Sequence, residues 1–200
     1  MFYEPKKGVP FDIDPFKSLV FPRPIGWISS VNKNGIANLA PYSYFNAVTD
    51  EPPQIMFCSN GSSSHYKYKD SLSNILSTKE FVVNFATSST RNQMNNSSID
   101  FKPDEDEFIL SKLKKKKSKL VRAPSVKDSP VNLECKLVKI IKLKSKSKKI
   151  STMIIGEVIG IYINNKFVKN GRIDSVSMNY IARMGYSEYT TVSSKFNLKR

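Results

Sequence analysis

A succession of extended, strand-like runs most constrains the fold of this chain. Val131 to Leu143 alternates apolar and polar residues, which is the pattern of a strand with one buried face. Ile150 to Ile163 is a second long run, in which Gly156 and Gly160 predict bulges or points of close backbone approach. No alternation of strands with helices runs through the chain, so a parallel βαβ arrangement is not expected. The sequence predicts a mainly β, antiparallel barrel with a few short peripheral helices.

Three more strands are predicted in the N-terminal half. Ile25 to Val31 leads into a turn at 32–35, because Asn and Gly tolerate positive φ. Ile36 to Val48 is a longer extended segment that we expect to be broken at Pro41. Pro52 and Pro53 then open a strand from Gln54 to Ser59.

Short helices and one irregular stretch are predicted in the middle of the chain. Asp70 is a good N-cap for a helix that ends near Thr78. Phe81 to Ala86 follows as a strand, and a polar helix is expected from Ser88 to about Asn96. Residues 97–130 are predicted to be an irregular connection.

The formal net charge of +15 is concentrated in one part of the chain. Residues 111–150 hold fifteen of the 32 Lys and Arg residues but only two acids. Lys112 to Arg122 and Lys142 to Ile150 are Lys/Ser-rich runs, which we interpret as solvated loops, with weak contact to an anion or a membrane surface as the alternative. A nucleic-acid reader would interleave aromatic or Arg side chains. Specific nucleic-acid binding is therefore not expected.

The length of 200 residues predicts a single domain, 1–200, with Lys-rich loop expansions at about 97–122 and 143–149. No apolar run approaches the roughly 18 to 20 residues of a membrane span, and the first residues lack the apolar core of a secretory signal. We therefore expect a cytoplasmic protein without a transmembrane segment. Cys58, Cys135 and the lone His65 make no metal-ligand cluster, and His65 is given no catalytic role.

Three polar elements in the first 75 residues could together hold an anionic ligand with a planar ring. Lys69-Asp70-Ser71 precedes a helix whose free N–H groups suit an anion, although such a tripeptide is more often only a cap. Asn38 to Tyr44 offers amides, hydroxyls and aromatic walls on one bent strand, or else ordinary barrel core. Ser59 and Asn60 end the next strand with polar groups.

These elements, in this order and spacing, resemble the flavin reductase-like family of FMN-binding split-barrel proteins. The resemblance is close from about Pro22 to Phe85 and continues through residues 129–135 and 155–158. It ends at Tyr180 to Tyr189, which is similar to the family's Arg-x-Gly element followed by a tyrosine. About three quarters of the chain is covered, and the two loop expansions depart from the pattern.

The resemblance implies an antiparallel split β-barrel that binds FMN and forms a homodimer with its cofactor sites near the subunit boundary. Tyr186 stands where the family often has glycine. Carried onto this sequence, the cofactor-binding residues are Asn38, Ala40, Pro41, Tyr42, Ser43, Tyr44, Ser59, Asn60, Lys69, Asp70 and Ser71, with Arg183 and Tyr189 near the rim.

The function that we expect is an FMN-dependent oxidoreductase, in which NADH or NADPH reduces the flavin and an acceptor takes up the electrons. The flavin carries the redox chemistry, so no catalytic acid or base is assigned. The chain has no G-x-G-x-x-G turn, so the nicotinamide would bind transiently without a Rossmann unit. The alternative is a non-enzymatic, flavoredoxin-like electron carrier or sensor. A third reading is an anion or membrane-surface binder acting through the Lys-rich runs.

Overall fold

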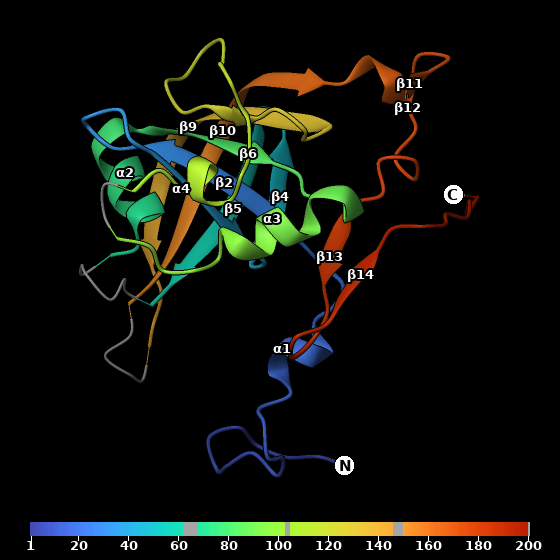
Figure 1. Ribbon diagram of the computed structural model, residues 1–200. Helices are drawn as coiled ribbons and strands as arrows, with labels where there is room; N and C mark the ends of the chain where they lie inside the picture. Colours follow the sequence, from blue (N-terminus) through green and yellow to red (C-terminus); the bar gives the residue numbers. More distant parts are fainter. Residues whose placement is uncertain (62–67, 103–104, 146–149, 200) are drawn as a thin grey trace.

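The computed structural model describes residues 1–61, 68–102, 105–145 and 150–199. Its main sheet has seven strands, all paired antiparallel, in the order β3-β2-β6-β9-β10-β5-β4 (Figure 1). The prediction of a mainly β, antiparallel fold with few short helices is confirmed. The strands are β2 (Gly26–Val31), β3 (Ala37–Tyr42), β4 (Phe45–Asp50), β5 (Pro53–Asn60), β6 (Glu80–Asn84), β9 (Val131–Lys142) and β10 (Ser151–Ile163).

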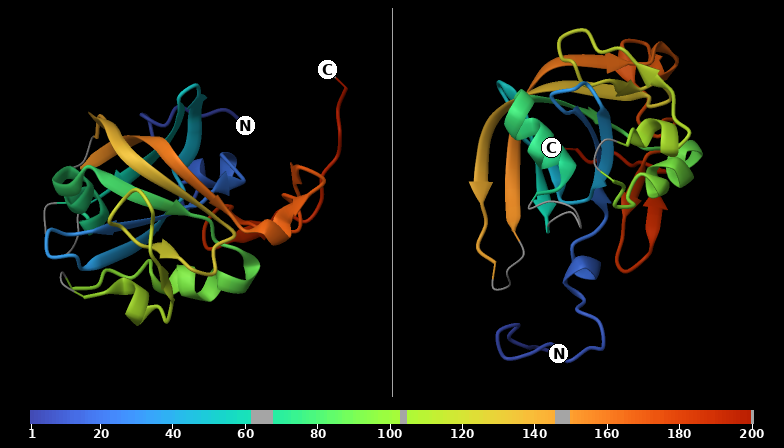
Figure 2. Two further views of the ribbon diagram at one scale, coloured as in Figure 1. Left: turned by 90° about the horizontal axis from the view of Figure 1, so that it is seen from above. Right: turned by 60° about the vertical axis from the view of Figure 1, so that its left-hand side comes forward.

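The sheet is strongly curled (Figure 2). Its two edge strands, β3 and β4, follow one another directly in the chain. The ladder is not closed between them; Ser43 and Tyr44 form the corner, and the Tyr44 carbonyl accepts a 2.8 Å hydrogen bond from the amide of Cys58 in β5. The predicted break at Pro41 is wrong, because Pro41 lies within β3 opposite Trp27. Proline is tolerated there since β3 is an edge strand, and a missing N–H on its outer side costs no ladder hydrogen bond.

Glycines in β10 produce the predicted irregularities. The register between β9 and β10 shifts at Ile155/Gly156 and again at Val158/Gly160. A Cβ on Gly156 would lie 2.4 Å from the Cζ of Phe81, a fully buried ring of the barrel core. Glycine is therefore required for the sheet to bend over this ring.

Helix α2 (Asp70–Thr78) closes one end of the barrel and buries Leu72 and Ile75 in the core. Its N-cap is Lys69, and Asp70 is the first helical residue, so the expected cap was placed one residue too late. The predicted polar helix is present as a 3-10 turn, η1 (Ser88–Thr90), followed by α3 (Arg91–Asn96).

The described part of residues 97–130 is mostly irregular, as predicted, but it is interrupted by three short elements. This segment contains α4 (Glu107–Leu110), β7 (Lys115–Lys116) and β8 (Ser125–Val126). Phe108 and Val126 are fully buried in a second core cluster, against the outer face of β2 and β3. Because the segment is rich in Lys, the sequence analysis did not predict that these two isolated apolar residues are buried.

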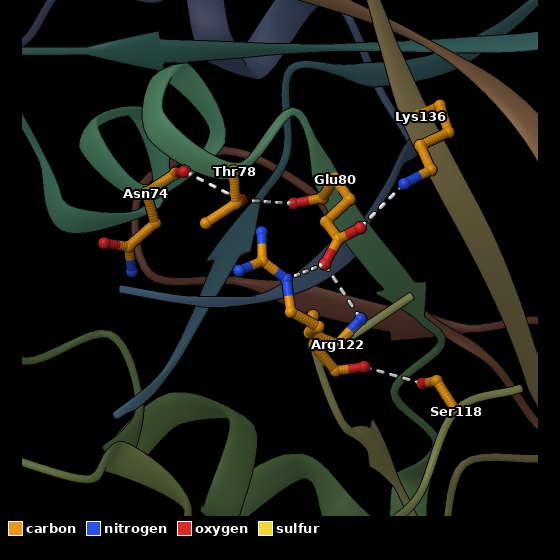
Figure 3. A network of polar contacts seen from close by, with 7 residues as sticks. Asn74, Thr78, Glu80, Ser118, Arg122 and Lys136 are labelled. Carbon is orange, nitrogen blue, oxygen red and sulfur yellow. Dashed lines mark hydrogen bonds and ion pairs between the residues drawn. The ribbon is translucent and has the colours of Figure 1, made fainter. Parts of the chain in front are cut away.

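Two buried carboxylates attach the Lys-rich segment to the barrel, so it is not a freely solvated loop. The Glu134 carboxylate accepts the backbone amides of Lys119 and Leu120. Glu80 accepts hydrogen bonds from the backbone amide and Nε of Arg122, and also binds Nζ of Lys136 (Figure 3). Of the second Lys-rich run, residues 146–149 lie outside the described ranges.

Segments from near the two ends of the chain pair in a small sheet beside the barrel. Its order is β1 (Arg23–Pro24), β13 (Ile181–Arg183), β14 (Tyr189–Thr191), and α1 (Phe16–Leu19) precedes it (Figure 1). The connection from β10 contains η2 (Asn165–Phe167), β11 (Val168–Lys169) and β12 (Arg172–Ile173). None of the helices in the described ranges is long and apolar enough to cross a membrane.

Candidate functional site

Two neighbouring cavities use opposite sides of β3, because side chains alternate along a strand. The small cavity, of about 260 Å³, takes Asn38, Ala40 and Tyr42. The large cavity, of about 730 Å³, takes Pro41 and the corner residues Ser43 and Tyr44. Ser98, just after α3, lines both, so the two cavities adjoin.

The large cavity is bounded by the N-terminal arm (residues 13–18), the corner after β3, α3 and the β13–β14 hairpin. Strand pairing places Arg183 opposite both Arg23 and Tyr189. Arg183 donates hydrogen bonds to the Tyr189 hydroxyl and the Tyr186 carbonyl, and its guanidinium lies 4.4 Å from the centre of the Tyr189 ring. The cavity thus combines aromatic faces with fixed positive charge.

Tyr186 is a rim residue that the sequence analysis did not include among the cofactor-binding residues. It lies at the tip of the β13–β14 hairpin with φ of 48°, a region that favours glycine. This fits its place at a position where the family often has glycine. Half of its surface is exposed, and its side chain lines the large cavity.

The small cavity lies at the start of α2. Lys69, Asp70 and Ser71 line it together with Asn38, Ala40 and Tyr42, so the structure brings six of the expected residues into one cavity. The Ser71 hydroxyl donates a 2.7 Å hydrogen bond to Oδ1 of Asn38. The other lining residues are Ser97, Ser98, Ile99, Asp100 and Glu107.

Two buried hydroxyls next to the small cavity have no hydrogen-bond partner among the described residues. These are Tyr42 Oη and Ser59 Oγ. The Tyr42 hydroxyl lies near Ser71 and Ser59 without good hydrogen-bond geometry to either, and burial raises the pKa of Tyr42 to about 12. Unpartnered buried polar groups are costly, so this arrangement suits a site that receives a polar ligand.

Ser59 and Asn60 line neither cavity. Ser59 is buried within β5, and Asn60 is exposed at its end. Arg183 and Tyr189 line the large cavity. His65 lies outside the described residues.

Glu107 is the site residue that sequence reasoning missed. It is only 6% exposed, and its carboxylate accepts a 2.7 Å hydrogen bond from Nδ2 of Asn38 and another from the backbone amide of Leu39. Burial raises the pKa of Glu107 to about 8, an effect reinforced by Asp70 and opposed by the hydrogen bonds from Leu39 and Asn38. The sequence feature that could have indicated a buried Glu107 is the apolar Phe108, which directly follows the acidic run.

In the part of the chain that the structure describes, no group of three or more His, Cys, Asp or Glu side chains is arranged to hold a metal ion. Cys58 and Cys135 are buried free thiols on β5 and β9.

Comparison with known proteins matches residues 17–183 to the model of the flavin reductase like domain. An uncharacterised protein of Aquifex aeolicus is 35% identical over 186 residues, which is 90% of this chain and 90% of that protein. The structure of nitrilotriacetate monooxygenase component B from Bacillus cereus superimposes with a TM-score of 0.88 at 29% identity, covering 99% and 98% of the two chains. That of 2-nitrobenzoate 2-nitroreductase from Pseudomonas fluorescens gives 0.80 at 28% identity, covering 92% and 88%.

The family match extends over most of the chain and includes the small cavity, the β3 corner and the β13 strand, together with part of the lining of the large cavity. It confirms the resemblance inferred from the sequence and the split-barrel character of the fold. The chain belongs to the flavin reductase-like family.

Proposed function

We propose that this protein is an FMN-dependent oxidoreductase that takes reducing equivalents from NADH or NADPH and passes them to an acceptor. The observation that carries the proposal is the pair of adjoining cavities on β3, one with rings and arginines, the other with a lysine at a helix start. The names of two structural relatives, a monooxygenase component and a nitroreductase, agree with redox chemistry.

The residues present fit a flavin mononucleotide. A cavity of about 730 Å³ lies within the usual range for sites of organic ligands. Tyr44 and Tyr189 offer ring faces to the isoalloxazine, and Arg183 offers positive charge at its edge. Lys69 and the backbone amides in the first turn of α2 suit the phosphate, and the hydroxyl of Tyr42, which has no partner among the described residues, could donate to the ligand.

When bound, FMN supplies the redox chemistry by accepting a hydride and releasing electrons. The protein's part is to orient the ring and to exclude water from one of its faces. The Arg183 guanidinium favours negative charge that develops near it, which raises the tendency of a neighbouring ring to accept electrons. Neither the acceptance of the hydride nor the release of the electrons requires an acid or base from the protein.

A homodimer belongs to this proposal. The N-terminal arm and the residues that flank it, 11–21, carry large apolar side chains that are about half or more exposed in the single chain, and such patches mark association surfaces. Since the same arm lines the large cavity, a second copy packed on it would lie close to the flavin. These side chains are Phe11, Ile13, Phe16, Leu19, Val20 and Phe21.

The test is to load the purified protein with FMN and to follow the visible flavin absorbance after adding NADH or NADPH under anaerobic conditions. Bleaching with either donor supports the reductase. FMN binding without bleaching by either donor rejects reductase activity and leaves the electron carrier, which a reduced protein donor would then have to reduce.

A further inference from the structure

Glu107 occupies an unusual position for a carboxyl group. It lies at the start of α4, is held in place by the neighbouring buried Phe108, and reaches the free edge of β3. There it lines the same small cavity as Lys69 and Ser71, in which the proposed function puts the phosphate. A negative charge at this point opposes the binding of an anion.

The hydrogen bonds around Glu107 are those of its ionised form. Both oxygens accept, one from Nδ2 of Asn38 and the other from the amide of Leu39. Since the Asn38 amide turns its NH₂ group to Glu107, its oxygen faces Ser71 and accepts the Ser71 hydroxyl proton at 2.7 Å. The Ser71 Oγ therefore presents only its lone pairs to the small cavity, and these lone pairs repel a phosphate.

The neutral form whose proton points toward Asn38 requires the opposite arrangement. A proton on the oxygen that faces Asn38 needs an acceptor, so the Asn38 amide must turn over to present its oxygen. Its NH₂ group then donates to Ser71 and Ser30, which lie on the other side at 2.7 and 3.3 Å. The Ser71 hydroxyl then no longer donates to Asn38, and its O–H can point into the small cavity. The amide of Leu39 still donates to the second carboxyl oxygen.

We propose that Glu107, Asn38 and Ser71 form a proton-linked switch, in which uptake of one proton by Glu107 turns over the Asn38 amide and directs the Ser71 hydroxyl to the phosphate of a bound flavin nucleotide. Glu107 is thus a positioning residue that acts through Asn38 and Ser71. The proton comes from solvent and returns to it when the ligand leaves. This inference rests on the proposed function and adds a regulation to its site.

The surroundings of Glu107 favour a switch that operates near neutrality. Burial already raises the pKa of Glu107 to about 8, and a bound phosphate would raise it further. Among the described residues around it, acids outnumber the two lysines, so the net surrounding charge disfavours the ionised carboxyl. The groups that face it are Lys69 and Asp70 of α2, Asp100, Lys102 and Glu105 of the preceding segment, Asp106 beside it, and Tyr42 of β3.

The expected size of the effect follows from the protonated fraction. With a pKa of about 8, roughly nine tenths of Glu107 is protonated at pH 7 and one tenth at pH 9. If only the neutral form accepts FMN, the apparent Kd at pH 9 is about tenfold that at pH 7. The phosphate itself does not titrate in this window, since its second pKa lies near 6.

The experiment measures the FMN Kd by quenching of flavin fluorescence at pH 7, 8 and 9. Glu107→Gln reproduces the neutral arrangement, because its amide can donate to Asn38 and its oxygen can accept from Leu39. Its Kd should stay at the wild-type pH 7 value throughout. Glu105→Gln, which removes a neighbouring carboxylate outside this hydrogen-bond chain, should keep the tenfold change.

Riboflavin, which lacks the phosphate, should bind the wild type with little dependence on pH. Calorimetry in two buffers of different ionisation enthalpy gives the proton uptake directly, about half a proton per FMN at pH 8, without any variant. The switch is overturned, and the proposed function is not, if the wild-type FMN Kd does not change between pH 7 and 9. The same holds if the FMN Kd of Glu107→Gln changes with pH as much as that of the wild type. Failure of FMN to bind at any pH overturns the proposed function as well.

Discussion

Replacing Glu80 by Gln tests whether a buried carboxylate holds the Lys-rich segment on the barrel. Glu80 begins β6, is 4% exposed, and accepts three hydrogen bonds of 2.7 to 2.9 Å (Figure 3). Two come from Arg122, through its backbone amide and its Nε, and the third from Nζ of Lys136. Glu80→Gln keeps the shape but removes the charge and turns one acceptor into a donor that faces other donors.

The expected loss in the free energy of unfolding is about 2 to 3 kcal/mol. The side chains of Arg122 and Lys136 are 62% and 46% exposed, so water compensates most of the two ion pairs, each of which would contribute no more than about 1 kcal/mol. The backbone amide of Arg122 and the mismatched NH₂ of Gln add roughly 1 to 2 kcal/mol. For a chain of 200 residues this lowers Tm by about 4 to 12 °C.

The assay is thermal and urea unfolding at pH 7, followed by circular dichroism. Glu4→Gln is the matched control: its carboxylate also binds a lysine, Lys7, at 2.6 Å, but both side chains are at least half exposed, and its Tm should not change. If Glu80→Gln unfolds at the same midpoint as the control, the carboxylate does not anchor the segment and the reasoning is refuted.

The same variant predicts a pH dependence. Burial acts to raise the pKa of Glu80, but the hydrogen bonds from Lys136 and Arg122 outweigh it and leave the pKa below its ordinary value. A carboxyl with a lowered pKa stabilises the folded state fully above its unfolded pKa of about 4.3. The advantage of the wild type over Glu80→Gln should therefore disappear as the pH falls through the lowered value, and an advantage that persists there would contradict the assignment.

Four further variants test the site and the fold. Lys69→Ala combined with Ser71→Ala should weaken FMN binding at least tenfold, since each charge-assisted contact contributes roughly 1.5 to 3 kcal/mol, while riboflavin binding changes little; equal losses for both ligands would put the phosphate elsewhere. Tyr42→Phe should leave the Tm of the ligand-free protein unchanged or higher, because it removes an unpartnered buried hydroxyl, yet raise the FMN Kd. Gly156→Ala should cost about 1 to 3 kcal/mol by pressing on the Phe81 ring, whereas Gly160→Ala, which meets the end of the Leu120 side chain at 3.1 Å, should cost less; the reverse order would contradict the contact.

Local sequence signals predicted the parts of the fold that depend on local physics. Alternation in Val131 to Leu143 and glycines in the next strand identified β9, β10 and their bulges, because period and backbone freedom are written into neighbouring residues. Pro41 misled the prediction, since whether a proline breaks a strand depends on which side of the strand has a neighbour. That is a property of the sheet and not of the tripeptide around the proline.

In the candidate site, too, residues with a local sequence signal were predicted, and a residue positioned by tertiary packing was not. Residues of β3 and of the α2 start were found because their order in the chain resembles the family pattern, and the structure brings six of them into one cavity. Glu107 is 69 residues beyond Asn38, in a segment whose lysines suggested only a solvated loop. Its position depends on Phe108, a single apolar residue that becomes informative only when the core it enters is known.

Glu80 and Glu107 show why burial alone does not decide what a carboxyl group does. Both are less than 10% exposed, but the partners of Glu80 are two cations that remain in contact with solvent, whereas those of Glu107 are neutral amides with further acids nearby. The first environment favours the ionised form and gives a stabilising contact; the second favours the neutral form and raises the pKa to about 8. A carboxyl with a raised pKa stabilises the folded state below its unfolded pKa, and this contribution is lost as the pH rises through 8. The Tm of the wild type should therefore fall relative to Glu107→Gln between pH 5 and 9, and parallel pH profiles of the two proteins would show that Glu107 does not titrate in this range.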